Sequence, residues 1–198
     1  RALREQVIPD AIARNDATRQ LKIWSAGSST GAEAYSVAAV VHQALGARRA
    51  DWRVSIVGTD INQAFLAHAR RGIFNDWALR DVAPAERAAV VERVEGGLQV
   101  LPALREMVAF GHQNLMSLSL RPAATDLLQG FDIVLCRNVL IYFGEALQKR
   151  TLGVFERSLQ RGGFLVLGSS ESMLDSDATW APVQTELRIF RKTMAGAR

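Results

Sequence analysis

Short apolar runs alternate along the chain with segments whose apolar residues recur at helical spacing. Runs at 21–26 and 54–57 predict strands, and the segments 33–45 and 62–71 that follow them predict helices. In the second of these helices we expect Phe65, Leu66 and Ala69 to face inward, and Gly72 stands where a C-terminal cap belongs. Residues 1–20 are expected to form an amphipathic lead-in or linker helix, whose apolar run is interrupted by Pro9.

The alternation stalls over residues 75–106, where prolines and glycines surround a short helical stretch at 84–93 and a strand-like piece at 98–100. We interpret this segment as an insertion into the main pattern. The pattern resumes with strands at 107–110 and 131–136, a helix at 145–159 and a strand at 164–168. Near the end, residues 183–191 alternate as an edge or antiparallel strand would.

Strands that alternate with helices predict an α/β fold with a mostly parallel sheet and helices on both faces. The near-continuous apolar run at 131–136 is typical of a strand that is buried on both sides. Ligands of such sheets bind at the carboxyl ends of the strands. The residues that follow each strand are therefore the candidates for chemistry.

Composition narrows the class of protein without identifying it. The chain has 198 residues, 48% hydrophobic and 22% charged, as expected for one globular domain. The net charge of +4 is spread without a basic block and does not indicate nucleic-acid binding. No apolar stretch is long enough to cross a bilayer, and no signal sequence opens the chain.

A single cysteine excludes an internal disulfide and a cysteine-based zinc site, and it fits a reducing cytoplasm. Because the chain begins at Arg1 rather than Met, we expect it to be part of a longer protein.

The loop after the first strand contains Gly27, Gly31 and small hydroxyl residues, and it opens a helix. Such a loop brings the backbone close to a ligand, and the helix N-terminus offers free N–H groups. Neither the Gly-Lys-Ser/Thr of a P-loop nor the Gly-x-Gly-x-x-Gly spacing is present. Glu33 either attracts an ammonium group of a ligand or stabilises only the helix start through its dipole.

Asp60 ends the second predicted strand. An acidic residue at this position, after a glycine loop, commonly binds both hydroxyls of a ribose. The alternative is that Asp60 caps the helix that starts near Asn62, since aspartate is a favoured N-cap.

Polar residues also follow the third and fourth strands. Asn114 follows the third strand and could form a hydrogen bond with an adenine edge. Arg137 and Asn138 follow the fourth strand, at the expected mouth of the site. For Arg137 the alternative is a structural ion pair with Asp132 or Glu171.

The remaining reactive side chains suggest no further chemistry. His42, His68 and His112 lack the spacing of metal ligands, and we interpret them as structural or solvated. Cys136 lies in a predicted buried strand without a His–Asp signature, so we expect an inert thiol rather than a nucleophile. No metal site is expected.

Several motifs occur in the order found in one family. Residues 23–36, IWSAGSSTGAEAYS, resemble the signature W-S-A-[GA]-x-S-T-G-E-E-P-Y-S of the chemoreceptor glutamate methyltransferases, the CheR family. Residues 131–143, FDIVLCRNVLIYF, resemble its second signature, F-D-x-[IV]-x-C-R-N-V-[LM]-I-Y-F, almost residue for residue. Shorter matches lie at 58–61 with 69–74, at 113–115 and at 168–172. The likeness runs from about residue 20 to residue 192.

The resemblance implies a class I, Rossmann-like fold that binds S-adenosylmethionine (SAM). Its parallel sheet would hold one antiparallel strand, with a small β-subdomain inserted around residues 75–106. We therefore expect a lead-in at 1–20 and a SAM-dependent methyltransferase domain at 21–198. Tyr142 matches a tyrosine near the transferred methyl group. The cofactor contacts that we expect come from the glycine loop and from positions that match the family: Gly27, Glu33, Asp60, Asn114, Leu115, Arg137 and Asn138.

The sequence departs from the family in three ways. Ala32 and Ala34 stand where the first signature has Glu and Pro, so we take the retained Glu33 as the ligand-facing acid. The family's N-terminal helical domain, whose N-[EL]-T-x-F-F-R segment contributes to the SAM site, is not in this sequence. We expect Arg1 to follow shortly after it, and the chain by itself to bind SAM poorly. The short loop at 95–97 is not expected to dock a receptor tail peptide.

The resemblance implies a cytoplasmic, monomeric enzyme that methylates glutamates on cytoplasmic helices of methyl-accepting chemoreceptors. The products would be γ-glutamyl methyl esters and S-adenosylhomocysteine (SAH), and neither nucleic acid nor membrane would be a partner. A carboxylate acceptor is already ionised at neutral pH, so no strong general base is required. The phenol of Tyr142 either holds this carboxylate in line or packs with Phe143 with its hydroxyl in water. The alternative function is a catalytically weak SAM- or SAH-binding sensor or scaffold of a chemosensory pathway.

Overall fold

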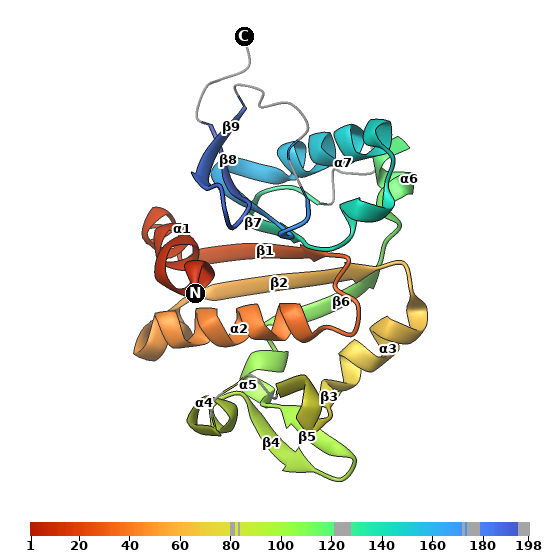
Figure 1. Ribbon diagram of the computed structural model, residues 1–198. Helices are drawn as coiled ribbons and strands as arrows, with labels where there is room; N and C mark the ends of the chain where they lie inside the picture. Colours follow the sequence, from red (N-terminus) through yellow and green to blue (C-terminus); the bar gives the residue numbers. More distant parts are fainter. Residues whose placement is uncertain (80–81, 83, 121–127, 172, 174–178, 194–198) are drawn as a thin grey trace.

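The computed structural model describes residues 1–79, 82, 84–120, 128–171, 173 and 179–193. Ser172 of the last short motif and residues 194–198 of the expected domain lie outside the described residues. A seven-stranded sheet forms the centre of the molecule (Figure 1). Its strands are β1 (Gln20–Ala26), β2 (Arg53–Asp60), β6 (Val108–His112), β7 (Phe131–Cys136), β8 (Leu159–Leu167), β9 (Trp180–Gln184) and β10 (Ile189–Lys192).

The strands of this sheet lie in the order β6-β2-β1-β7-β8-β10-β9. The first five neighbours pair in parallel, and they reproduce the 3-2-1-4-5 order of a doubly wound nucleotide-binding sheet. β10 pairs antiparallel with both β8 and β9, so it is the one strand that runs against the others. The predicted fold class is therefore confirmed.

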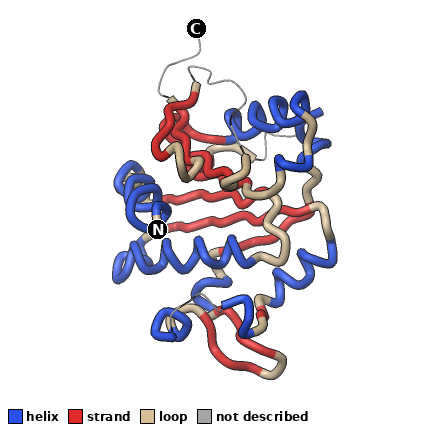
Figure 2. Tube along the Cα trace, viewed as in Figure 1, coloured by secondary structure: helices blue, strands red, loops and turns tan. Residues whose placement is uncertain are grey.

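Helices cover both faces of the sheet, as Figure 2 shows. Alternation along the buried strands produces two cores: Ile23 and Ile133 point to one face, and Trp24 and Val134 point to the other. α1 and α2 pack on the first face, whereas α6 and α7 pack on the second. The helices are α1 (Ile8–Arg14), α2 (Ala32–Leu45), α3 (Gln63–Arg71), α4 (Pro84–Ala88), α5 (Pro102–Arg105), α6 (Leu115–Leu120) and α7 (Glu145–Ser158). A π-helix spans Leu3–Val7, and 3-10 turns span Gly46–Asp51, Asp76–Leu79 and Leu140–Tyr142.

A second sheet of three antiparallel strands lies at the bottom of Figure 1, beside α4 and α5. Its strands are β3 (Ile73–Phe74), β4 (Val91–Val94) and β5 (Gly97–Val100), with β5 in the middle. Phe74, Leu98 and Val100 are buried in the same core as the inner face of α2. The second sheet is thus attached to the main body by an apolar contact.

Two predicted elements differ in the structure. The helix expected at 84–93 ends at Ala88, and β4 follows, because Gly96 and Gly97 adopt φ of +91° and +148° and turn the chain into a hairpin with β5. The single strand expected at 183–191 is instead the hairpin of β9 and β10. Its turn contains Arg188 at φ +52° and leaves Leu187 52% exposed.

Two individual positions were also predicted wrongly. Phe65 is 43% exposed, whereas Leu66 and Ala69 of the same helix are fully buried. Pro9 does not interrupt the N-terminal run but lies in the first turn of α1, directly after the π-helix, where its fixed φ suits a helical backbone. Val7 and Ile8 are fully buried on either side of the junction between the π-helix and α1.

Candidate functional site

The carboxyl ends of β1, β2, β6 and β7 lie at one edge of the sheet, on its right-hand side in Figure 1. The parallel register places Ala26 beside Thr59, and Asp60 beside His112. The strand ends, together with the loops and helix starts that follow them, carry every cofactor-binding residue that the sequence singles out. The structure therefore gathers them along a single edge.

The loop after β1 is held against its neighbours on both sides. The amides of Gly27 and Ser28 donate hydrogen bonds of 2.8 and 2.9 Å to the carbonyl oxygen of Thr59. Gly27 has φ +77°, and a Cβ added there would overlap Cγ2 of Val139 in the loop after β7. Gly31, at φ +87°, is the N-cap of α2. The first-turn N–H groups of α2 consequently face the edge that the loop occupies.

Glu33 lies in the first turn of α2 and is fixed by two partners. Its Oε1 accepts a hydrogen bond of 2.8 Å from Oγ of the buried Ser25, and its Oε2 lies 3.4 Å from Nη1 of Arg137. The side chain of Glu33 is 22% exposed and that of Arg137 is 49% exposed. Both groups therefore keep a surface that a ligand can reach.

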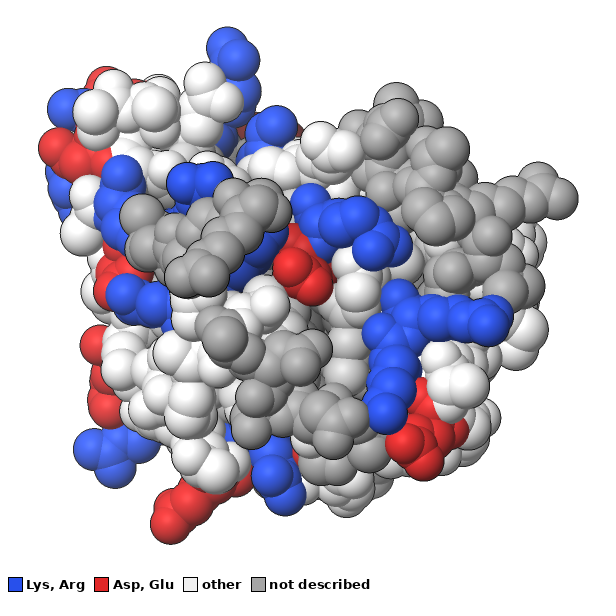
Figure 3. Space-filling model, turned by 90° about the horizontal axis from the view of Figure 1, so that it is seen from above, with Lys and Arg blue, Asp and Glu red and all other residues white. Residues whose placement is uncertain are grey.

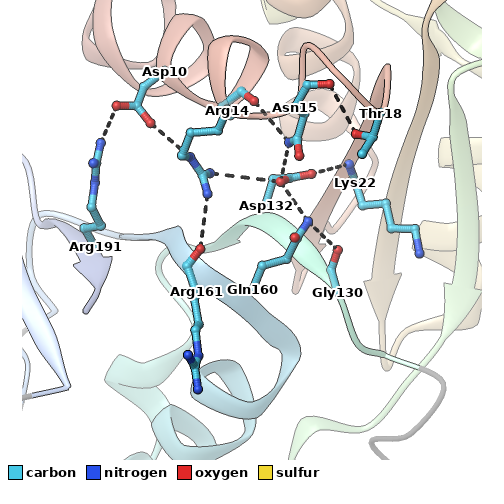
Figure 4. A network of polar contacts seen from close by, with 11 residues as sticks. Asp10, Arg14, Asn15, Thr18, Lys22, Gly130, Asp132, Gln160, Arg161 and Arg191 are labelled. Carbon is cyan, nitrogen blue, oxygen red and sulfur yellow. Dashed lines mark hydrogen bonds and ion pairs between the residues drawn. The ribbon is translucent and has the colours of Figure 1, made fainter. Parts of the chain in front are cut away.

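The two alternative partners considered for Arg137 are engaged elsewhere. Asp132 lies at the opposite edge of the sheet, where it accepts hydrogen bonds from Asn15, the amide of Lys22 and Gln160 (Figure 4). Glu171 accepts hydrogen bonds from backbone amides. Arg137 does form an ion pair, as the alternative to cofactor binding had it, but its partner is Glu33 and neither of the two residues named for that alternative.

A hollow of about 480 Å³ opens beside the ion pair of Glu33 and Arg137. Arg1, Leu3 and Arg4 line its other side. The beginning of the chain, remote in sequence from the strand ends, therefore forms one wall of the opening next to Glu33.

Asp60 ends β2 with its carboxylate fixed by two loop amides. Oδ2 accepts a hydrogen bond from the amide of Ser29 and Oδ1 accepts one from the amide of Asn62, both at 2.8 Å. The N-cap of α3 is Asn62 itself, whose Oδ1 accepts from two first-turn amides, so Asp60 is not the cap. Each carboxylate oxygen can accept a further hydrogen bond, and Asp60 is only half-buried. The carboxylate is therefore oriented and still able to bind a donor.

Asn114 follows β6 and acts as a cap for α6. Its Oδ1 accepts hydrogen bonds from the amides of Met116 at 2.9 Å and Ser117 at 3.4 Å, which leaves its NH₂ group as a donor. Leu115 is 7% exposed and packs in the second core. Ile61 after β2 and Met116 are exposed to 60% and 47% at this part of the edge. Each of them presents an apolar side chain to solvent.

The loop at 137–143 follows β7 and turns over the same edge. Asn138 has φ +60°, a left-handed conformation that asparagine adopts more readily than most other residues. A Cβ added to Gly168, after β8, would lie 2.7 Å from Oδ1 of Asn138, so the two segments are in close contact. The 3-10 turn then leaves Tyr142 80% exposed. The phenol is accessible from solvent.

Sequence reasoning assigned no site role to Ser25 or to Glu171. Ser25 shares the strand face of Ile23, toward α2, so the period of two in β1 would have placed its hydroxyl near Glu33. For Glu171 the available signal was the short match at 168–172.

Cys136 is fully buried, and this burial raises the pKa of its thiol well above the ordinary value, with Glu171 and Glu33 adding to the shift. His42 and His68 lie in α2 and α3, and His112 ends β6.

Within the described ranges, no group of His, Cys, Asp and Glu side chains could hold a metal ion. None of the helices described has the length and apolar character that a bilayer crossing requires. On the face seen in Figure 3, basic side chains lie among acidic and neutral ones rather than in one block.

The strand order, the glycine loop after β1 and the acidic residue at the end of β2 define a SAM-dependent methyltransferase domain of class I. The chain belongs to the CheR methyltransferase family, because the model of that family's SAM-binding domain matches residues 1–189.

Curated relatives agree with this membership. The chain is 37% identical over 174 residues to chemotaxis protein methyltransferase 1 of Vibrio cholerae, covering 86% of this chain and 60% of the relative. It is 33% identical over 175 residues to the chemotaxis protein methyltransferase of Listeria monocytogenes, covering 88% of this chain and 62% of the relative. The chain thus spans about 60% of the length of the curated relatives that it matches.

SAM is the cofactor of this domain, and the residues present fit it. SAM carries an ammonium group and two ribose hydroxyls but no phosphate. Two oriented carboxylates, Glu33 and Asp60, lie at the two sides of the loop after β1, where they would oppose a diphosphate but suit these donors. Because Gly27 has no side chain, the backbone of that loop can lie directly against Val139.

Proposed function

We propose that the full-length protein containing this chain is a protein-glutamate O-methyltransferase that forms γ-glutamyl methyl esters on chemoreceptors. The observation that carries the proposal is the ion pair of Glu33 with Arg137 at the same sheet edge as Asp60, with Tyr142 exposed in the turn that follows β7. This edge offers a place for a charged cofactor and an open side for a protein substrate.

Each site residue has a role in this proposal. Glu33, held by Ser25, binds the ammonium group of the cofactor, while Arg137 keeps Glu33 in place and offers its exposed guanidinium to the cofactor carboxylate. Asp60 accepts from the ribose hydroxyls. The backbone at Gly27 and the side chain of Asn138 border the methionine end, and Asn114 and Leu115 border the adenine.

Bound SAM supplies a methyl group on a positively charged sulfur. With Glu33 and Asp60 holding the cofactor, an acceptor glutamate carboxylate would take this methyl group in a direct displacement, with SAH as the leaving group. The chain needs no general base for this step, since the acceptor is an anion at neutral pH. Its contribution is alignment and exclusion of water. In this proposal Tyr142, whose side chain is exposed, donates a hydrogen bond to the acceptor carboxylate.

The partners and the location belong to the same proposal. The acceptors are glutamates on cytoplasmic helices of methyl-accepting chemoreceptors, and the enzyme acts in the cytoplasm as a monomer. The relatives named chemotaxis protein methyltransferases support a methyltransferase that acts in chemotaxis. We also propose that residues 1–20 serve as a lead-in to the domain at 21–198, with the second sheet as its inserted subdomain.

The test is methyl transfer from tritiated SAM by the full-length protein to a cytoplasmic receptor fragment from the same organism. We expect label that is released by mild base, and no label on a fragment whose acceptor glutamates are replaced by glutamine. SAH affinity without base-labile transfer to any receptor of that organism would instead support the sensor or scaffold. That alternative is motivated by Ala32, which stands where the family carries a second acid.

A further inference from the structure

A buried carboxylate joins the loop after β7 to the end of β8. Glu171 is 3% exposed and follows β8 by a tight turn, in which its own amide donates to the carbonyl oxygen of Gly168. In the described part of the chain, its carboxylate accepts three hydrogen bonds, all from backbone amides. Oε1 accepts from Val139 at 2.8 Å and from Leu140 at 2.7 Å, and Oε2 accepts from Gly168 at 2.6 Å.

Burial of a carboxylate is costly unless its lone pairs are satisfied, and hydrogen bonds to a charged acceptor are stronger than neutral ones. The carboxylate of Glu171 thus ties together two segments that no strand pairing joins at this point. Two of the amides that it binds, those of Val139 and Leu140, follow Asn138 and lead into the 3-10 turn that carries Tyr142.

The same contact constrains the conformation of the loop. Asn138 is held at φ +60°, and its side chain lies against Gly168, where a Cβ would come within 2.7 Å of Oδ1 of Asn138 and 2.8 Å of Oε2 of Glu171. Asn138 of the loop at 137–143, Gly168 and the carboxylate of Glu171 are therefore packed against one another.

We propose that Glu171 is a positioning residue of the methyl-transfer reaction. It holds the backbone of the loop at 137–143 so that Arg137 meets Glu33 and Tyr142 stands at the open side of the edge. The inference rests on the proposed function for its effect on turnover, but its effect on the loop itself does not depend on that function.

The principal test variant is Glu171→Gln in the full-length protein, and the chain offers a matched control in Asp132→Asn. Asp132 is also a buried carboxylate with three hydrogen bonds, and Arg14 lies 4.0 Å from it (Figure 4). It is bound by donors from Asn15, Lys22 and Gln160, none of which is a site residue. Both substitutions replace one acceptor oxygen by an NH₂ group that faces a donor, so both lower stability. Only the first disturbs the loop.

At a temperature well below both unfolding midpoints, Glu171→Gln should lower the turnover of receptor methylation about tenfold or more, because alignment is the main contribution of the site. Asp132→Asn should keep wild-type turnover. Hydrogen exchange of the Val139 and Leu140 amides should accelerate in Glu171→Gln and not in Asp132→Asn. Wild-type turnover with unchanged exchange in Glu171→Gln, or an equal loss of turnover in Asp132→Asn, overturns the proposal.

Gly168→Ala provides a second variant, which carries the test if Glu171→Gln does not fold. This variant keeps the carboxylate of Glu171 but adds a methyl group that overlaps Asn138 and Glu171. It should therefore lower turnover, as Glu171→Gln does. Should the wild-type protein methylate no receptor, the proposed function fails, and SAH calorimetry then decides the positioning role. Glu171→Gln should bind SAH about tenfold more weakly than Asp132→Asn, since the loop borders the cofactor; equal affinities with equal loop exchange contradict it.

Discussion

Nη1 of Arg137 lies 3.4 Å from Oε2 of Glu33, although 104 residues separate the two in the chain. The pair spans the carboxyl ends of two adjacent parallel strands, β1 and β7, and it stands beside the hollow that the first residues of the chain help to line. It joins the helix after one strand to the loop after the other. This geometry is the starting point for tests of how the cofactor is bound.

Replacing Glu33 by Gln should weaken SAH binding by about 1.5–3 kcal/mol, the usual range for a hydrogen bond to a charged group. The loss follows because the amide removes the charge that the ammonium group and Arg137 share. Calorimetry with the full-length protein measures it. Glu92→Gln, at an exposed position of β4, is the control and should bind as the wild type does. Equal affinity in both variants would leave Glu33 as a residue of the helix start only.

Asp60→Ala should weaken binding of SAM and SAH by about 1–3 kcal/mol, because the ribose hydroxyls lose a charged acceptor. The loop amides of Ser29 and Asn62 also lose their partner, so circular dichroism should first show that the variant is folded. Adenine has no contact with this carboxylate in our proposal, so free adenine should not compete differently. An unchanged SAH affinity in the folded variant would contradict the ribose role.

Tyr142→Phe should lower turnover roughly ten- to a hundred-fold and leave SAH affinity nearly unchanged, since one hydrogen bond and the alignment it gives are lost. The side chain is 80% exposed, so the substitution should not change stability. Turnover and affinity are measured on the same preparation. If both fall together, Tyr142 belongs to the cofactor pocket instead, and equal turnover would exclude a role in transfer.

Burial raises the pKa of the Asp132 carboxyl above 3.8, even though hydrogen bonds from the Lys22 amide and Asn15 oppose the shift. The folded state then holds this proton more tightly than the unfolded state does. The contribution of Asp132 to the free energy of unfolding should therefore decrease as the pH rises from about 3.8 through the raised pKa, and stay constant above it. Urea unfolding of the wild type and of Asp132→Asn, at several pH values from about 3.8 upward, measures how the difference between their free energies of unfolding changes with pH. A difference that grows with pH would mean that the hydrogen bonds outweigh burial.

Cys136 should not react with a thiol reagent such as a disulfide dye in the folded protein at pH 8. The side chain is fully buried and its pKa is raised by burial, so neither access nor thiolate is available. Reaction should appear only in denaturant, at the rate of an ordinary thiol. Rapid labelling of the native protein would show that the strand end opens.

Much of the fold follows from local patterns. Apolar runs of strand length and helical repeats place β1, α2, β7 and α7 to within about two residues, which is the usual uncertainty of element ends. Patterns fail where a turn decides the outcome. The turn from Thr185 to Arg188 reverses the chain and divides one run of alternating apolar and polar residues into β9 and β10. The alternation is the same before and after the turn, so the pattern alone does not show where the turn lies.

By itself, the sequence determined the order of the elements, the residues at the strand ends and the family, because strand and helix periods and motifs are local properties of the chain. Only the tertiary structure decided which side chains meet there. The partner of Arg137 is Glu33 rather than Asp132 or Glu171, since the latter two are satisfied by donors from Asn15 and Val139 respectively. Such pairings depend on which strands lie side by side in the sheet and on which donors surround each buried carboxylate. Both are properties of the tertiary structure, and the spacing of residues along the chain does not predict them.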